Sequence, residues 1–204
     1  MKYVKEAGSG EYEEKKSRFI GELYPVKSEE EAQEILQQVR KKYYDARHHC
    51  FAYVLGEKGE IKKQSDDREP SRTAGMPILD VLTGEDLRDA LLVVTRYFGG
   101  TLLGTGGLVR AYTEAAKAAV AGSRLMEALD GYEAVCEAPY TLVGKLQYLA
   151  RQQEVPELSI EYGAAVTFTW FLTPEKRDAF EEAVRDLSGG ALTLAINKSR
   201  WYNS

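Results

Sequence analysis

The order of strand-like and helix-like segments in the second half is the feature that most restricts the fold. Four segments have the β-branched and aromatic content of strands: residues 132–138, 158–162, 164–172 and 191–197. Residues 141–152 have the apolar spacing of a helix. A second helix follows Thr173-Pro174, where a capping residue precedes a proline at the first helical position. The order β-α-β-β-α-β predicts a ferredoxin-like domain.

The first half predicts a different mixture of strands and helices. Strands are expected at residues 18–26, 49–56, 60–63 and 90–96, and helices after Ser28, at 76–82 and at 107–121. Ser28 and Glu31 have the spacing of a capping box at the first helix. The fold class is therefore α+β, with one domain over residues 1–125 and the ferredoxin-like domain over residues 126–204.

Composition and charge restrict the classes of function. The chain of 204 residues is 44% hydrophobic and has no apolar run of the roughly 20 residues that cross a bilayer. Its polar beginning does not resemble a secretory signal, and Cys50 and Cys136 are too far apart for a Cys-x-x-Cys site. We expect a cytoplasmic monomer without membrane contact. Residues 126–204 carry seven basic and twelve acidic residues, which supply the net charge of −5, so bulk attraction to nucleic acid is disfavoured.

The strongest candidate for a site is a glycine-rich segment at residues 95–110. It contains five glycines between a buried strand and a helix: Gly99, Gly100, Gly104, Gly106 and Gly107. Free N–H groups at a helix start form a ready anion site, and Arg96 and Arg110 flank this one. The segment lacks the spacing of a Walker A loop or a dinucleotide fingerprint. The alternative is a glycine-lined bend that lets the helix pack tightly on the strand.

A polar loop at residues 65–77 is the second candidate. Asp66, Asp67 and Glu69 are suited to binding a cation or to acid–base chemistry. The same side chains can instead cap the following helix or pair with Arg68 and Arg72. No metal site or cofactor is predicted, because the further oxygen ligands of a hard cation cannot be placed.

The third candidate is the segment Asp45-Ala-Arg-His-His-Cys50. On a strand, His48 and Cys50 share one face and His49 lies on the other. A Cys–His nucleophile pair is therefore disfavoured, and His49 is kept as a candidate lining residue. Four tyrosines near the loops are weak candidates for stacking on bases: Tyr43, Tyr44, Tyr97 and Tyr112.

Four motifs in this order resemble the YigZ/IMPACT family. They are KSRFI at residues 16–20, DARHHC at 45–50, SDDREPSRTAGMP at 65–77, and the segment 95–112. The resemblance implies a first domain of the ribosomal-protein S-five domain-two-like type, a fold shared with small-molecule kinases. It also implies a second domain similar to the last domain of elongation factor G.

The resemblance implies a link to translation. Eukaryotic members of the family restrain the starvation response by competing for an activator of a kinase that acts on a translation initiation factor. Arg68 and Arg72 stand where the family's loop usually has glycine. We therefore expect fewer positive-φ turns in this loop and a stronger attraction for anions.

Three functions remain open at this point. The preferred hypothesis is a non-enzymatic protein that binds RNA, the ribosome or a translation factor through the loops 65–77 and 97–107. The second is a phosphate-handling enzyme that uses the same loops, with Asp66 or Asp67 holding a cation or acting as a base. The third is a protein–protein adaptor without nucleic acid.

Overall fold

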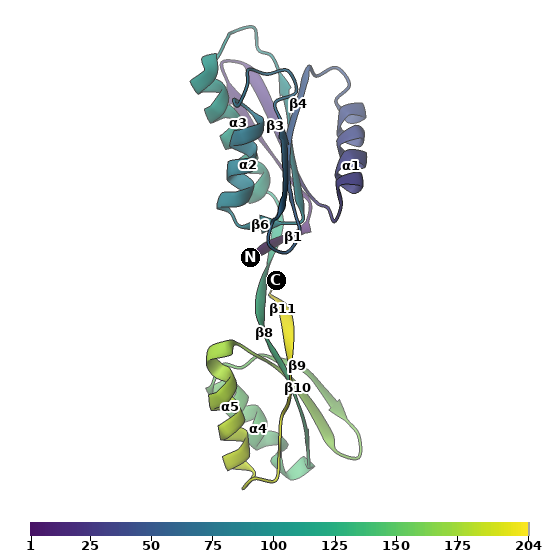
Figure 1. The fold of residues 1–204 in the computed structure, drawn as a ribbon, viewed down its shortest axis with the longest axis vertical. Helices are drawn as coiled ribbons and strands as arrows, with labels where there is room; N and C mark the ends of the chain where they lie inside the picture. Colours follow the sequence, from purple (N-terminus) through teal and green to yellow (C-terminus); the bar gives the residue numbers. More distant parts are fainter. Residues whose placement is uncertain (204) are drawn as a thin grey trace. The chain divides into compact units, whose positions relative to one another are not determined.

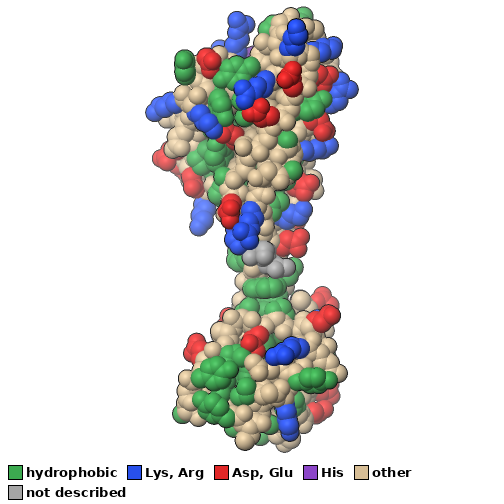
Figure 2. Space-filling view, turned by 180° about the vertical axis from the view of Figure 1, so that it is seen from behind, with side chains coloured by type: hydrophobic (Ala, Val, Ile, Leu, Met, Phe, Trp, Pro, Cys, Tyr) green, Lys and Arg blue, Asp and Glu red, His purple; other side chains and the backbone are tan. Residues whose placement is uncertain are grey.

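The computed structural model describes residues 1–203 and separates into two compact units, Met1–Glu127 and Ala128–Asn203 (Figure 1). Each unit contains helices and strands, so the predicted α+β class is confirmed. On the face shown in Figure 2, basic and acidic side chains are interspersed over the first unit. No helix among residues 1–203 is long and apolar enough to cross a membrane.

A five-stranded sheet forms the centre of the first unit. Its order is β2-β3-β7-β4-β5, and every neighbouring pair is antiparallel. The strands span Gly8–Glu14 (β2), Ser17–Pro25 (β3), His48–Leu55 (β4), Ile61–Ser65 (β5) and Ala90–Tyr97 (β7). Because β4 runs antiparallel to β7, the start of β4 and the end of β7 lie at the same end of the sheet.

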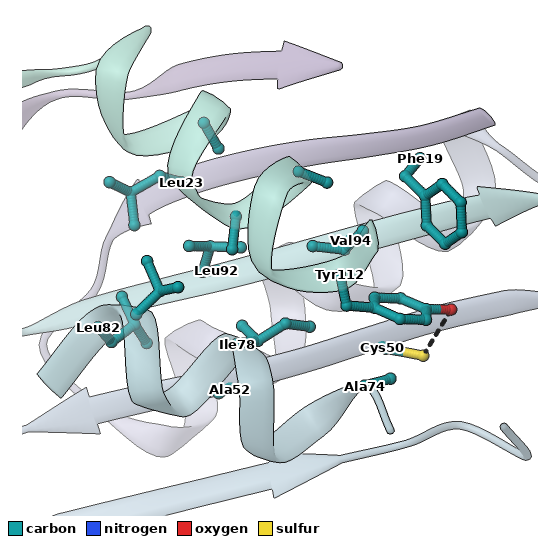
Figure 3. Close-up of a cluster of buried hydrophobic side chains, with 14 of the residues drawn as sticks. Phe19, Leu23, Cys50, Ala52, Ala74, Ile78, Leu82, Leu92, Val94 and Tyr112 are labelled. Carbon is teal, nitrogen blue, oxygen red and sulfur yellow. Dashed lines mark hydrogen bonds between the residues drawn. The ribbon is translucent and has the colours of Figure 1, made fainter. Parts of the chain in front are cut away.

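Helices cover both faces of this sheet. Helix α1 (Glu29–Lys42) lies on one face, and α2 (Gly75–Gly84) and α3 (Gly104–Ala121) lie on the other (Figure 1). Residues of β4 alternate between these two layers, as the two-residue period of a strand requires. Phe51 packs in the α1 layer, whereas Cys50 packs against α2 and α3 (Figure 3).

The predicted cap of α1 forms with a shift of one residue. Ser28 accepts a hydrogen bond from the Glu31 amide at 3.2 Å. The Glu31 carboxylate reaches back to the amide of Lys27 rather than to that of Ser28. Two backbone amides at the helix start, those of Glu31 and Lys27, thus have side-chain acceptors. Both acceptors lie within one turn, so the sequence pattern could locate the helix start.

Three strands of the first unit were not predicted. They are β1 (Lys2–Glu6), β2 and β6 (Leu87–Arg88), of which β1 pairs with β6 and with the first residues of β8 (Arg124–Ala138). β2 is polar, so it lacks a strong strand pattern. Its glycines allow α3 to lie directly on it: a Cβ added at Gly10 would stand 2.4 Å from the Ala118 carbonyl carbon.

The second unit has the predicted ferredoxin-like order. After β8 it contains a short 3₁₀ turn (Tyr140–Leu142), α4 (Val143–Gln152), β9 (Glu157–Tyr162), β10 (Val166–Leu172), α5 (Pro174–Leu187) and β11 (Ala195–Asn203). Its core is built around Phe168, Trp170 and Phe180, whose rings are in contact. β8 starts before the predicted residue 132 because Arg124–Glu127 also pair with β1. β11 starts at Ala195, after the predicted residue 191.

Candidate functional site

The two predicted loops meet at the end of the sheet where β4 begins and β7 ends. They enclose a cleft of about 450 Å³. The lining residues come from β4, from both loops and from the start of α3. They are Arg47, His48, Glu69, Pro70, Arg96, Phe98, Leu102, Leu103, Gly104, Thr105 and Leu108. A volume of this size is typical of sites that bind small molecules or anchoring side chains.

A buried polar network forms the floor of the cleft. The Glu69 carboxylate accepts hydrogen bonds from the Arg96 guanidinium at 2.6 Å and from the Tyr112 hydroxyl at 2.8 Å. Arg96 is 6% exposed, and its guanidinium lies over the rings of Phe19 and Phe98. The opposite charges of Glu69 and Arg96 cancel, because two buried ions can be kept only as a well-bonded pair.

The two arginines predicted to flank an anion site do not converge. Arg96 lines the cleft, but its charge is neutralised by Glu69. Arg110 does not line the cleft; it donates to both carboxylate oxygens of Glu14 on β2, at 2.7 and 3.4 Å. The hydrogen bond from Arg110 lowers the pKa of Glu14 below its ordinary value. The predicted arginine pair therefore does not form a phosphate clamp.

Two carboxylates of the acidic loop, those of Asp66 and Asp67, accept hydrogen bonds from backbone amides. Asp66 accepts hydrogen bonds from the amides of Arg72, Ala74 and Gly75 at 2.8 to 3.0 Å. It thereby closes the loop and caps α2, whose own N-cap residue provides no side-chain acceptor. Asp67 accepts from the His49 amide at 2.7 Å. The role of Asp66 is the helix cap that the sequence left open as an alternative to cation binding, whereas the bond of Asp67 to β4 was not among those alternatives.

The expectation of fewer positive-φ turns in this loop is wrong. Arg68 has a φ of 71° and Arg72 a φ of 63°, both in the left-handed region that favours glycine. The hydrogen bonds made by Asp66 hold the backbone in this shape and offset the strain of a non-glycine residue. Both arginine side chains remain exposed. One Arg68 nitrogen donates to the carbonyl of Arg47 at 3.1 Å.

The five glycines have different roles. A Cβ on Gly99 would stand 2.0 Å from the backbone of Lys16, so this glycine is required for close packing. Gly100 and Gly104 have φ of 86° and 72°, which glycine adopts without strain. Gly106 faces open space, and Gly107 has only the Leu103 side chain nearby. Of the five, only Gly104 lines the cleft.

Helix α3 begins at Gly104, three residues before the predicted start. Its N-cap residue, Leu103, makes no side-chain capping hydrogen bond. Gly104 and Thr105 in the first turn line the cleft. The positive end of the helix dipole therefore reaches the cleft.

The histidines and Cys50 separate as the strand pattern predicted. His48 lines the cleft, with its Nδ1 at 2.9 Å from the Asp67 carbonyl oxygen. The ring of His49 bonds to the Tyr43 carbonyl, away from the lining residues, and burial lowers its pKa. The single S–H of Cys50 lies within hydrogen-bonding distance of two acceptors, the Asp66 carbonyl and the Tyr112 hydroxyl (Figure 3), and burial raises the pKa of the thiol. No Cys–His nucleophile pair is formed.

One of the four tyrosines, Tyr112, lies where its ring cannot stack on a base, and Tyr97 has a fixed hydroxyl. Tyr112 is fully buried beneath the cleft, where burial raises the pKa of its hydroxyl. Tyr97 donates its hydroxyl to Asp45 at 2.7 Å, and burial raises its pKa to about 12. No group of three or more His, Cys, Asp or Glu side chains within residues 1–203 is arranged to hold a metal ion.

The apolar walls of the cleft were not predicted. They are provided by Pro70, Phe98, Leu102, Leu103 and Leu108. Leu102 is 82% exposed and Phe98 is 49% exposed. One sequence signal could have indicated these walls: two adjacent leucines, Leu102 and Leu103, lie in a glycine-rich loop, where large apolar side chains are not expected to be buried in a core. The positions of Arg47 and Pro70 could not be inferred, because they depend on how the loops close.

Family models match both parts of the chain. The model of the Impact N-terminal domain matches residues 15–120, and that of a domain of unknown function (DUF1949) matches residues 136–191. The IMPACT family member YvyE of Bacillus subtilis is 41% identical over 192 residues, which cover 92% of this chain and 86% of that protein. The IMPACT family member YigZ of Escherichia coli is 35% identical over 182 residues, covering 88% and 89%. A crystal structure of a hypothetical protein has a TM-score of 0.60 and 33% identity, with 95% of each chain covered.

Proposed function

Because this chain belongs to the IMPACT family, as its motifs predicted, we propose that it regulates translation as a non-enzymatic binding protein in the cytoplasm. Its partner is a protein of the translation machinery, a translation factor or a ribosomal protein. The partner docks on the cleft between the loops 65–77 and 97–107. The family resemblance supports the link to translation, and the geometry of the first unit supports the proposed place of contact.

The observation that carries this proposal is the exposure of large apolar side chains around a preformed cleft. Leu102 is 82% exposed and Phe98 is 49% exposed, and both line the cleft. Apolar side chains in such a position lose contact with water when a partner covers them, which favours association. They belong to a loop fixed at both ends by β7 and α3, so little ordering is needed on binding.

Protein is favoured over RNA by the state of the charged residues. Arg96 and Arg110 are paired with Glu69 and Glu14, so neither is free to neutralise a phosphate. The net charge is −5, and the visible face of the first unit mixes both signs (Figure 2). Nucleic-acid binding depends mainly on many unpaired positive charges. At the cleft rim Arg47 and Arg68 lack an ion pair within residues 1–203, and two cations are few for a phosphate backbone. The phosphate-handling enzyme has no comparable support, because Asp66 is engaged with backbone amides.

The test is a pull-down of the tagged full-length chain from a cell lysate at two salt concentrations, with and without nuclease. Translation factors or ribosomal proteins should be recovered, and their recovery should survive nuclease. A Leu102→Glu variant should lose them, because it places a charge on the apolar wall. Recovery that disappears with nuclease would favour RNA as the partner and contradict the proposal.

A matched control uses Ile61, another exposed aliphatic residue of the first unit. It is 45% exposed on β5 and does not line the cleft. Ile61→Glu changes the charge of the protein as Leu102→Glu does, so it should retain the partners. Equal losses in both variants would show that net charge, rather than the cleft, governs association.

A further inference from the structure

We propose that the cleft recognises a short peptide segment in which a large apolar side chain is flanked by acidic residues. This inference rests on the proposed function, since it names the chemistry of the partner at the same site. Three features of the cleft define it: an apolar interior, a rim of unpaired arginines, and the uncapped start of α3.

The interior accepts an apolar side chain. Phe98, Leu102, Leu103, Leu108 and Pro70 supply its walls. The Glu69 carboxylate on the floor already accepts from both Arg96 and Tyr112. The Arg96 Nε atom has no hydrogen-bond partner within residues 1–203, but it is buried and so does not reach a ligand in the cleft. A polar side chain would therefore lose its water without gaining a strong partner, whereas an apolar one loses nothing. The anchor of the peptide is thus a leucine, methionine or aromatic residue.

The rim carries positive charge that the chain does not neutralise. Arg47 lines the cleft and is exposed, and Arg68 beside it donates to the Arg47 carbonyl at 3.1 Å. Within residues 1–203, neither guanidinium forms an ion pair with an acidic side chain. The carboxylates of the neighbouring loop are turned inward, where Asp66 and Asp67 accept from backbone amides. Two adjacent cations without a counterion favour carboxylates, which guanidinium groups bind in bidentate fashion.

The start of α3 adds a second positive feature. Its N-cap, Leu103, provides no side-chain acceptor, and Gly104 and Thr105 of the first turn line the cleft. Negative charge is favoured at such a helix end. A Cβ at Gly104 would meet no atom within 4 Å, so the backbone there is open to a ligand. A carboxylate near the anchor can therefore be satisfied at the helix start as well as at the rim.

Selection from random peptides tests this chemistry without assuming a sequence. Twelve-residue peptides are displayed and selected on the full-length protein, with removal of those that also bind the Leu102→Glu variant. The enriched peptides should combine Asp or Glu with a large apolar residue a few positions away. Enrichment of basic or purely polar peptides would overturn the inference, as would an enriched set that binds the variant equally well.

The consensus peptide is then measured by fluorescence anisotropy. Leu102→Glu should weaken it at least about tenfold, which corresponds to about 1.4 kcal/mol. Arg47→Ala should weaken it less, by about threefold, and the Arg47 loss should shrink at high salt. The control Ile61→Glu should bind as the wild type does. An Arg47→Ala variant that binds unchanged, or a twelve-nucleotide single-stranded RNA that displaces the peptide, would overturn the acidic-peptide assignment.

The two proposals fail in different ways. If translation proteins are captured from lysate through Leu102 but the selected peptides are not acidic, the function stands and the peptide chemistry is wrong. If an acidic apolar peptide binds at the cleft but the captured proteins do not belong to translation, the peptide chemistry stands and the function is wrong.

Discussion

The loop at residues 66–74 is fixed by carboxylates that accept hydrogen bonds from backbone amides. The loop at 98–103 is fixed by close backbone packing, which is possible because Gly99 has no side chain. Asp66 alone bonds to three amides in the first loop. In the second, Gly99 lets the backbone lie against Lys16. The acidic residues and glycines, which most resembled a binding site in the sequence, therefore stabilise the two loops. Other residues of these loops form the exposed surface at the cleft. Arg68 and Leu102 are examples, one from each loop.

Glu69→Ala should have the largest effect on stability. It leaves the buried charge of Arg96 without its partner and removes the acceptor of the Tyr112 hydroxyl. Breaking a buried ion pair on one side costs about 3–5 kcal/mol. The measurement is the free energy of unfolding in urea. Glu69→Gln keeps an acceptor and should lose less; a loss below about 1 kcal/mol for the alanine variant, as for an exposed pair, would show that the network does not hold the loop.

Gly99→Ala should have the second-largest effect on stability, because it tests the loop whose close backbone packing requires a residue without a side chain. Its new methyl group would stand 2.0 Å from the Lys16 carbonyl carbon, so the backbone must move. Overpacking of this kind costs about 1–3 kcal/mol. Gly106→Ala is the matched control: its Cβ enters open space, so we expect no loss and a gain of up to about 1 kcal/mol. Thermal unfolding of both variants decides whether packing or glycine content matters.

Asp66→Asn should cost about 1–2 kcal/mol, in the range of a lost helix cap. The amide oxygen can keep the bonds that Oδ1 accepts from Ala74 and Gly75, but the NH₂ group then faces the amide of Arg72 and cannot accept from it. Hydrogen exchange should accelerate at residues 72–75 and remain unchanged in the second unit. Uniform acceleration throughout the chain would mean that Asp66 supports the whole fold and not this loop alone.

The smallest expected effect is a pH dependence that originates beneath the acidic loop. Burial lowers the pKa of His49, whose ring bonds to the Tyr43 carbonyl and lies near Asp67, Arg40 and His48. The unfolded chain therefore binds a proton more readily at this site, with a pKa of about 6.5. The contribution of neutral His49 to the free energy of unfolding is therefore fully present above that pH. It falls as the pH drops through 6.5 toward the folded pKa. His49→Gln should flatten this slope in urea titrations between pH 7 and 5; parallel slopes would assign it to other groups.

The sequence predicted those elements whose signals are local. Ser28 and Pro174 marked helix starts because capping acts within one turn. Strand β2 was missed because its polar residues lie at a sheet edge, and its pairing depends on Gly10 meeting α3 about a hundred residues away. The cleft was missed for the same reason: Arg47 and Leu102 come together only when both loops close. Long-range contacts of this kind leave no periodic signal.

The left-handed backbone at Arg68 and Arg72 sets stability against recognition. A non-glycine residue in that region is strained by about 1 kcal/mol or more. Replacing either arginine with glycine would relax the loop while removing an exposed cation. At Arg68, which lies beside Arg47, the same change would also weaken the proposed binding of acidic peptides. Arg68 is thus a position where thermostability and the proposed binding are not improved by the same substitution.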